Sequence, residues 1–159
     1  MAHSEILEFE TLESIKTAVA LLEGSTQDWW MIGGVAFLAH GVGSGALKDI
    51  DVLIGRADAR QIEQGPDVQL LSRGESELFQ SAHYFSCHAG EVPIEFMAEL
   101  KVRKNDAWHL LAPKTRMRKM LGDVEVFVPD AGELIAIAQL FGREKDLARA
   151  AALGAMTSS

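Results

Sequence analysis

Hydrophobic and polar residues alternate along the chain with two different periods, which predict helices at both ends and strands between them. From Leu7 to Leu22 the apolar residues recur at helical spacing, with Glu and Lys between them, so this segment predicts an amphipathic helix. Asp49 to Ile54 alternates strictly and places Ile50, Val52 and Ile54 on one face, which is typical of a half-buried strand.

Weaker patterns complete the predicted order of elements. Gly90 separates two apolar runs and predicts a hairpin there. The further strands are expected over Trp29–Ile32, Val68–Leu71, His83–Cys87, Val92–Met97 and Val124–Val128. The further helices are expected over Val35–His40, Asp58–Gln64, Ala131–Phe141 and Arg143–Leu153, and Met117, Met120 and Leu121 are interpreted as the core of a helix.

These elements predict an α+β fold, in which a mixed β-sheet is flanked by helices. The 159 residues fit a single domain, with a core over about 29–128 and a C-terminal helical part over about 130–154. The longest apolar run, from Trp29 to Leu47, has the length of a membrane span. Five glycines interrupt it, so we interpret it as a buried strand followed by a buried helix.

Charge bears on which partners the protein could bind, and cysteine content bears on its cellular compartment. The net charge of -8 argues against a protein that coats DNA nonspecifically, because such binding needs many cations. Lys101 to Lys119 nevertheless holds seven of the 15 Lys and Arg, with only Asp106 opposing them, so it is either a surface for a polyanion or an ordinary solvated face. The single cysteine and the lack of a signal-like pattern over Met1 to Glu10 predict a cytoplasmic protein.

Two carboxylates one residue apart on the clearest strand are the strongest candidate for chemistry. Side chains on a strand repeat every two residues, so Asp49 and Asp51 point the same way while Ile50 anchors the other face in the core. Like charges held this close repel, and a hard cation such as Mg²⁺ between them relieves the repulsion. The pattern therefore predicts a metal site.

A glycine pair upstream adds a candidate phosphate site. Gly33 and Gly34 lack Cβ atoms, so a phosphate chain can approach their backbone where the next helix begins. By itself the pair is a weak signal that fits a tight turn better than a phosphate site, but it becomes more specific beside Asp49 and Asp51.

A third carboxylate is needed for two metal ions about 4 Å apart, which is the arrangement that stabilises both oxygens of an in-line displacement. Glu95 is the candidate, because it lies on the polar side of a strand whose other face is apolar. Glu91 shares that side and Glu99 lies just beyond it, so Glu95 also fits an ordinary exposed acid.

The combination resembles the nucleotidyltransferase superfamily that includes DNA polymerase beta. The family pattern has three parts: a hydrophobic residue followed by two small residues, then Asp-hydrophobic-Asp, then a later acid. In this chain these parts are Ile32-Gly33-Gly34, Asp49-Ile50-Asp51 and Glu95. The stretches 133–136 and 142–147 are similar to the helical end of the small bacterial branch, which has toxin-type and antibiotic-modifying members.

The resemblance implies transfer of NMP from an NTP, such as ATP, to a hydroxyl on RNA (tRNA included), a protein or a small molecule, with release of pyrophosphate. It implies that Asp49, Asp51 and Glu95 are catalytic and hold two Mg²⁺ ions, and that Gly33, Gly34 and Lys145 bind the nucleotide. The resemblance does not specify the base or the acceptor. It also leaves open whether the protein acts as a lone chain, as a homodimer or with a partner protein.

One alternative belongs to another functional class. Relatives often place an Arg and a Ser or Thr just before the acidic pair, where this chain has Gly45, Ala46 and Leu47. The chain is therefore either an enzyme or a non-catalytic module that keeps the fold and binds a nucleotide or a partner.

Overall fold

The computed structural model describes residues 7–71 and 76–157, and this part of the chain contains five helices and ten strands. The helices are α2 (Phe9–Leu22), α3 (Gly33–Ala39), α4 (Arg56–Ile62), α5 (Ala131–Phe141) and α6 (Glu144–Thr157). The strands are β1 (Trp30–Ile32), β2 (Ile50–Ile54), β3 (Val68–Leu70), β4 (Phe79–Gln80), β5 (His83–Cys87), β6 (Ile94–Ala98), β7 (Lys101–Lys104), β8 (Ala107–Leu110), β9 (Met117–Leu121) and β10 (Val124–Val128).

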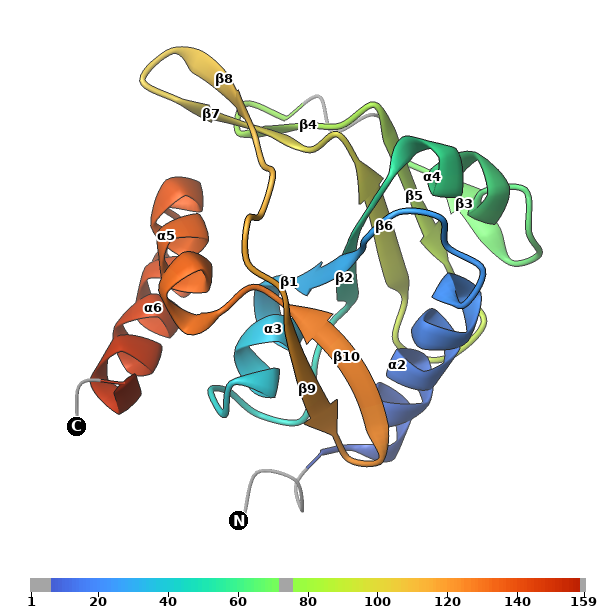
Figure 1. The fold of residues 1–159 in the computed structure, drawn as a ribbon, viewed down its shortest axis with the longest axis horizontal. Coiled ribbons are helices and arrows are strands. Elements are labelled where there is room, and N and C mark those ends of the chain that lie inside the picture. Colours follow the sequence, from blue (N-terminus) through green and yellow to red (C-terminus); the bar gives the residue numbers. More distant parts are fainter. Residues whose placement is uncertain (1–6, 72–75, 158–159) are drawn as a thin grey trace.

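A five-stranded mixed sheet occupies the centre, in the order β1-β2-β6-β5-β3 (Figure 1). The central pair, β2 and β6, is parallel, and the other neighbouring strands are antiparallel. Parallel neighbours need a long connection, which here includes α4, β3 and β5. The predicted α+β class, with helices flanking a mixed sheet, is confirmed.

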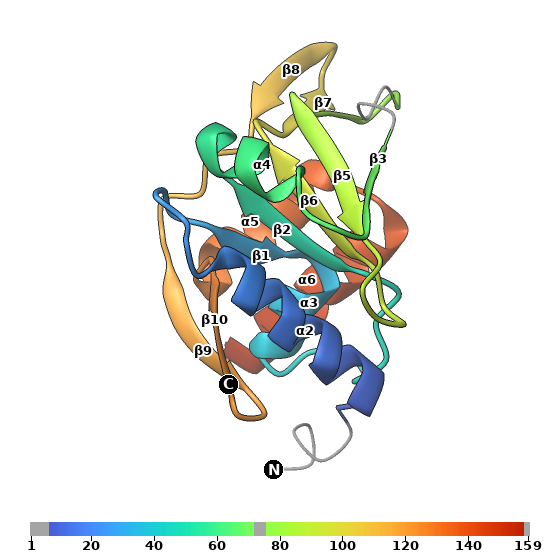
Figure 2. The same cartoon turned by 90° about the vertical axis from the view of Figure 1, so that its right-hand side faces the viewer.

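The two faces of this sheet have different coverings. In Figure 2, α2 crosses the near face, while α5 and α6 lie behind the sheet. Ile50, Val52 and Ile54 belong to the main hydrophobic core, which also contains Ile15 of α2 and Phe96 of β6. Alternation along β2 therefore directs the intervening side chains to the other face, where the candidate site lies.

The ends of the C-terminal helical hairpin follow from local sequence. Asp130 caps α5, since its side chain accepts a hydrogen bond from the backbone N–H of Glu133. Gly142 ends α5 in the left-handed conformation at φ 72°, which a residue without Cβ adopts readily. α6 begins two residues later and packs against α5 and α3, on the side of the sheet opposite α2 (Figure 2).

The predicted helical core at Met117, Met120 and Leu121 is wrong, because these residues lie in β9. That strand forms a hairpin with β10, in which Leu121 pairs with Val124 across a two-residue turn. Met117 and Met120 are exposed, and only Leu121 reaches the core. Their spacing resembled a helix, but backbone pairing with β10 decides the local structure.

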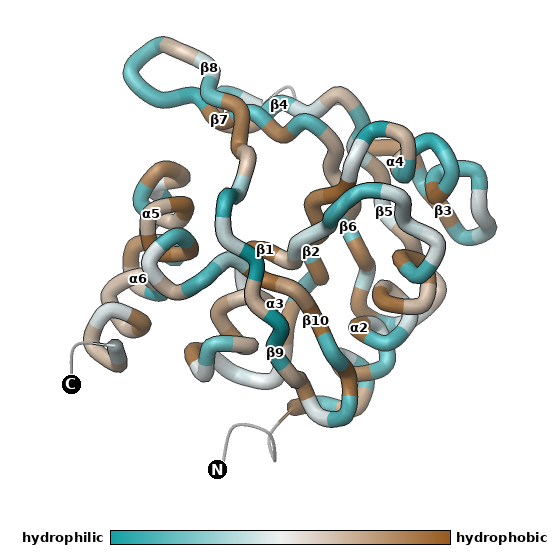
Figure 3. The backbone as a smooth tube through the Cα atoms, viewed as in Figure 1, coloured by the Kyte–Doolittle hydropathy of each residue, from teal (hydrophilic) through white to brown (hydrophobic). Residues whose placement is uncertain are grey.

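The basic segment 101–119 is mostly strand and connecting chain. β7 and β8 form a hairpin that joins β4 in a separate small sheet. Figure 3 shows that the turn of this hairpin is hydrophilic and lies at the edge of the molecule. Val102, in contrast, is fully buried and anchors the base of the hairpin.

The apolar run Trp29 to Leu47 contains β1 and α3, as expected, and both elements contribute residues to the hydrophobic core. Among the residues that the structure describes, no helix combines the length and the hydrophobicity that a membrane crossing requires.

Candidate functional site

Strand register brings the predicted acids into one row. In the sheet, Ile32 of β1 is opposite Asp51 of β2, and Asp51 is opposite Glu95 of β6. Directly opposite residues point to the same face, so these two carboxylates share the face that the main core does not occupy. Asp49 comes one residue before β2 and continues the same alternation.

The three acids form one cluster. One carboxylate oxygen from each of Asp49, Asp51 and Glu95 lies within 4.8 Å of the others, and all three side chains are half-buried. Carboxylate oxygens are the preferred ligands of hard divalent cations, so this group can hold a metal ion. Glu91 and Glu99 are exposed and lie outside the cluster, and Glu99 instead pairs with Arg56 at 3.9 Å.

The glycine turn lies directly against this cluster. Gly33 has φ 65°, and a Cβ placed on it would lie 2.8 Å from Asp51 Oδ2. Glycine is thus needed both for the left-handed backbone and for the space that the carboxylate occupies. Gly34 follows at the start of α3, where a Cβ would lie 3.1 Å from a guanidinium nitrogen of Arg149.

The electrostatics of the cluster favour a bound cation. Burial, followed by repulsion from Asp49 and Glu95, raises the pKa of Asp51 well above its ordinary value. Burial also raises the pKa of Glu95, with a further contribution from Asp49, while a hydrogen bond from Tyr84 opposes the increase. A cation between these oxygens would remove the repulsion, and the residues present therefore fit a metal.

Residues of the neighbouring strand β5 lie against Glu95. Tyr84 on β5 donates its hydroxyl proton to Glu95 Oε1 at 2.8 Å. Ser86 is opposite Glu95 in the sheet and its Oγ lies 2.7 Å from Nε2 of His88, the residue just after β5. Burial and then the Glu95 hydrogen bond raise the pKa of Tyr84, so the phenol is protonated and donates this bond while the cavity holds no substrate.

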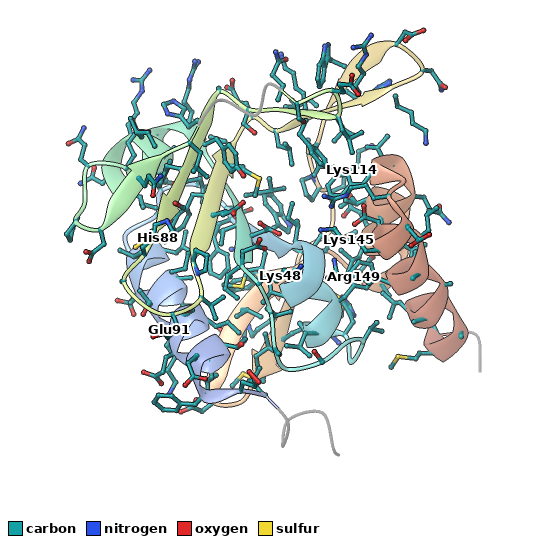
Figure 4. All side chains as sticks on the ribbon, turned by 180° about the vertical axis from the view of Figure 1, so that it is seen from behind. Lys48, His88, Glu91, Lys114, Lys145 and Arg149 are labelled. Atoms are coloured by element: carbon teal, nitrogen blue, oxygen red, sulfur yellow. The ribbon has the colours of Figure 1, made fainter. Side chains whose placement is uncertain are left out.

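Basic side chains face the acids across the cavity. Figure 4 shows Lys145 and Arg149 on the side of α6 that is turned toward the sheet, with Lys48 nearby. Lys145 lies close enough for its charge to act on Asp51 and Glu95. Arg143 also lines the cavity, but its guanidinium is paired with Asp146 at 2.6 Å.

The acids, the glycine turn, Tyr84 and these basic residues line one cavity of about 690 Å³. Its lining also includes Met97, Leu100, Phe79 and Phe141, the last two in an edge-to-face contact at 5.0 Å between ring centroids. The guanidinium of Arg143 lies over these two rings, 5.1 Å from the centroid of Phe79 and 5.7 Å from that of Phe141. A cavity lined by both charged and aromatic side chains suits a ligand that is partly anionic and partly a flat ring.

The cavity contains every site residue that the sequence predicts: Asp49, Asp51, Glu95, Gly33, Gly34 and Lys145. Sequence analysis did not predict Lys48, Tyr84 or Arg149. A signal existed for Arg149, since it follows Lys145 by four residues and so lies on the same helix face. Lys48 directly precedes Asp49, whereas Tyr84 carries no local signal because only the pairing of β5 with β6 brings it to Glu95.

The connector before Asp49 is uncharged at positions 45–47, and Lys48 is the cation that directly precedes the acid. Ala46 and Leu47 line the cavity, and they contribute no charge. Arg149 lies beside Gly34, close to Leu47. A cation of α6 therefore lies next to the uncharged part of the connector.

Comparisons with known proteins identify the fold. No protein-family model matches the chain, and no curated protein matches it. Among solved structures, the chain is similar to a Thermotoga maritima protein whose assignment as a nucleotidyltransferase is provisional, with 20% identity and a TM-score of 0.64. The match covers 82% of this chain and 84% of that one. At this identity the likeness shows that the two chains share a fold.

Proposed function

We propose that this chain is a magnesium-dependent nucleotidyltransferase, which moves NMP from an NTP to an acceptor hydroxyl and releases pyrophosphate. The observation that carries the proposal is the cluster of Asp49, Asp51 and Glu95, with oxygens within 4.8 Å, directly against the Gly33 turn. Metal-assisted phosphoryl transfer uses carboxylates that hold cations beside the phosphate oxygens. The shared fold with the Thermotoga maritima protein supports it.

In this proposal each group has a separate task. Asp49, Asp51 and Glu95 would hold two Mg²⁺ ions, which supply Lewis-acid stabilisation of the phosphate oxygens. The backbone turn at Gly33 and Gly34 would bind the phosphates beside Asp51 and Arg149, and Lys48, Lys145 and Arg149 would neutralise the phosphate charge. The aromatic and aliphatic side chains of the cavity would contact the nucleobase or the acceptor.

The reaction is an in-line displacement. The acceptor oxygen forms a bond to the α-phosphorus while the bond from that phosphorus to the α,β-bridging oxygen breaks, and pyrophosphate leaves. We assign the acceptor proton to Glu95, because this carboxylate lies in the acid cluster and lines the cavity.

A non-catalytic nucleotide-binding or partner-binding module is the second candidate. The observation that favours it is the uncharged connector of Gly45, Ala46 and Leu47 before the acidic pair. In this case the chain would bind an NTP and transfer nothing.

The deciding experiment supplies each α-labelled NTP, Mg²⁺ and a cell extract to the purified protein, and follows label into RNA, protein and small molecules. Transfer should occur with wild type and disappear in Asp49→Asn. Asp123→Asn is the matched control, since Asp123 is exposed in the β9–β10 turn and pairs only with Lys16 in the described part of the chain. Tight NTP binding without transfer to any acceptor would support the module and refute the enzyme.

A further inference from the structure

The hydroxyl of Tyr84 is hydrogen-bonded to Glu95, the proposed general base. It lies 2.8 Å from Glu95 Oε1. A general base must lie within hydrogen-bond distance, about 2.6–3.2 Å, of the hydroxyl that it deprotonates. Tyr84 lines the same cavity as the acid cluster, and its side chain is half-buried. Its oxygen is therefore next to the acids and can be reached from the cavity.

The sheet fixes this placement. Tyr84 is opposite Met97 on β6, and Glu95 is two residues before Met97, so both side chains point to the cavity face. Asp51 is opposite Glu95 on the next strand along. Three adjacent strands thus direct the phenol, the base and the metal-binding acid to one point.

We propose that Tyr84 is a modification site, at which the protein transfers NMP to its own chain. This inference rests on the proposed nucleotidyltransferase function, which supplies the NTP. Tyr84 Oη forms a bond to the α-phosphorus, the bond to the α,β-bridging oxygen breaks, and pyrophosphate leaves with its electron pair. The phenolic proton passes to Glu95 and then to solvent, and the product is a tyrosyl phosphodiester.

Tyr84 is favoured over the other hydroxyls of the cavity that the structure describes. Ser81 is only 6% exposed, so an incoming phosphate cannot approach it freely. Ser76 Oγ is engaged with the backbone of Phe79, at 2.8 Å from its N–H. Tyr84, in contrast, already donates to the proposed base.

Modification at Tyr84 limits the reaction. The attached NMP would remain in the cavity of about 690 Å³ and cover Glu95, so no second acceptor could reach the base. Self-labelling should therefore stop at one NMP per chain, and transfer to external acceptors should fall as labelling proceeds.

The test incubates purified full-length protein with each NTP and Mg²⁺, then measures intact mass and maps labelled peptides. Tyr84 is the single tyrosine of the chain, so a labelled tyrosine identifies the site without ambiguity. We expect a mass increase of one NMP on the peptide that holds Tyr84, at a rate that is independent of protein concentration. Tyr84→Phe should show no such increase, and Asp49→Asn should lose it together with all other transfer.

Peptide mapping separates this inference from a role in which Tyr84 only orients Glu95. An orienting tyrosine would leave wild-type Tyr84 unlabelled, while Tyr84→Phe lowered transfer to external acceptors. An unchanged intact mass, or label confined to another residue, overturns self-modification. If external acceptors are still labelled in that case, the proposed function stands; if nothing is labelled, both proposals fail.

Discussion

Gly33→Ala separates the stability of the fold from the geometry of the candidate site. The new Cβ would lie 2.8 Å from Asp51 Oδ2, and the backbone at this position has φ 65°. The clash involves the end of a side chain, so rotation of the Asp51 carboxylate can relieve it. The backbone strain remains, since an L side chain in the left-handed region is disfavoured.

The structure gives two different magnitudes for this substitution. The left-handed conformation costs roughly 1–2 kcal/mol in folding free energy, which corresponds to a decrease in Tm of about 2–8 °C for a chain of this size. Displacing Asp51 affects the site far more, because a misplacement of about 1 Å in a catalytic arrangement costs on the order of a hundredfold in rate.

Gly43→Ala is the matched control. Gly43 has φ 104°, so alanine there is also strained, but a Cβ at Gly43 would have no neighbour within 4 Å. Thermal unfolding should show a loss of Tm for both variants. NMP transfer, and the increase in Tm caused by Mg²⁺ with NTP, should be lost only in Gly33→Ala. A Gly33→Ala protein that keeps both would refute the contact between the glycine turn and the metal site.

Three further substitutions test separate parts of the structure. Arg149→Ala should weaken NTP binding about tenfold or more by calorimetry, because charge-assisted bonds to phosphate are lost, whereas exposed Arg118→Ala should not. Asp51→Asn should have a higher Tm than wild type at pH 7 without metal. Burial and the neighbouring acids raise the pKa of Asp51. The stability of wild type therefore falls as the pH rises from the ordinary aspartate pKa to the raised value, and the uncharged asparagine avoids this loss. Asp58→Asn should lower stability at pH 7 by about 1–3 kcal/mol in denaturant titration, because three hydrogen bonds from Thr26 and Gln27 end on that carboxylate.

The Asp58 prediction also has a pH signature. Burial acts to raise the pKa of Asp58, but the bonds from Thr26 and Gln27 outweigh it and the pKa is lowered. Wild type should therefore lose its advantage over Asp58→Asn as pH falls below the ordinary aspartate pKa toward the lowered one. A stability difference that is constant across this pH window would contradict the hydrogen bonds assigned to Asp58.

Equal NTP affinity in Arg149→Ala would contradict the proposed phosphate site. A Mg²⁺-induced stabilisation that persists in Asp51→Asn would contradict the proposed metal site.

The elements that bury one face were predictable, and those that stay exposed were not. β2 and α2 alternate apolar and polar residues at the period of their structure, because half of each element packs in the core. β8 is exposed at every position, and β9 reaches the core only at Leu121. Such strands are held by backbone pairing with a neighbour, which leaves little hydrophobic pattern in their own sequence.

The sequence by itself determined the acidic pair and the glycine turn of this protein, because both depend on local rules. Strand alternation aligns Asp49 with Asp51, and only a residue without Cβ fits the turn at Gly33. The tertiary structure alone decided that Tyr84 meets Glu95, and that Arg149 of the last helix lies beside Gly34. These contacts join residues far apart in sequence, and they depend on strand register and helix packing, which no local pattern encodes.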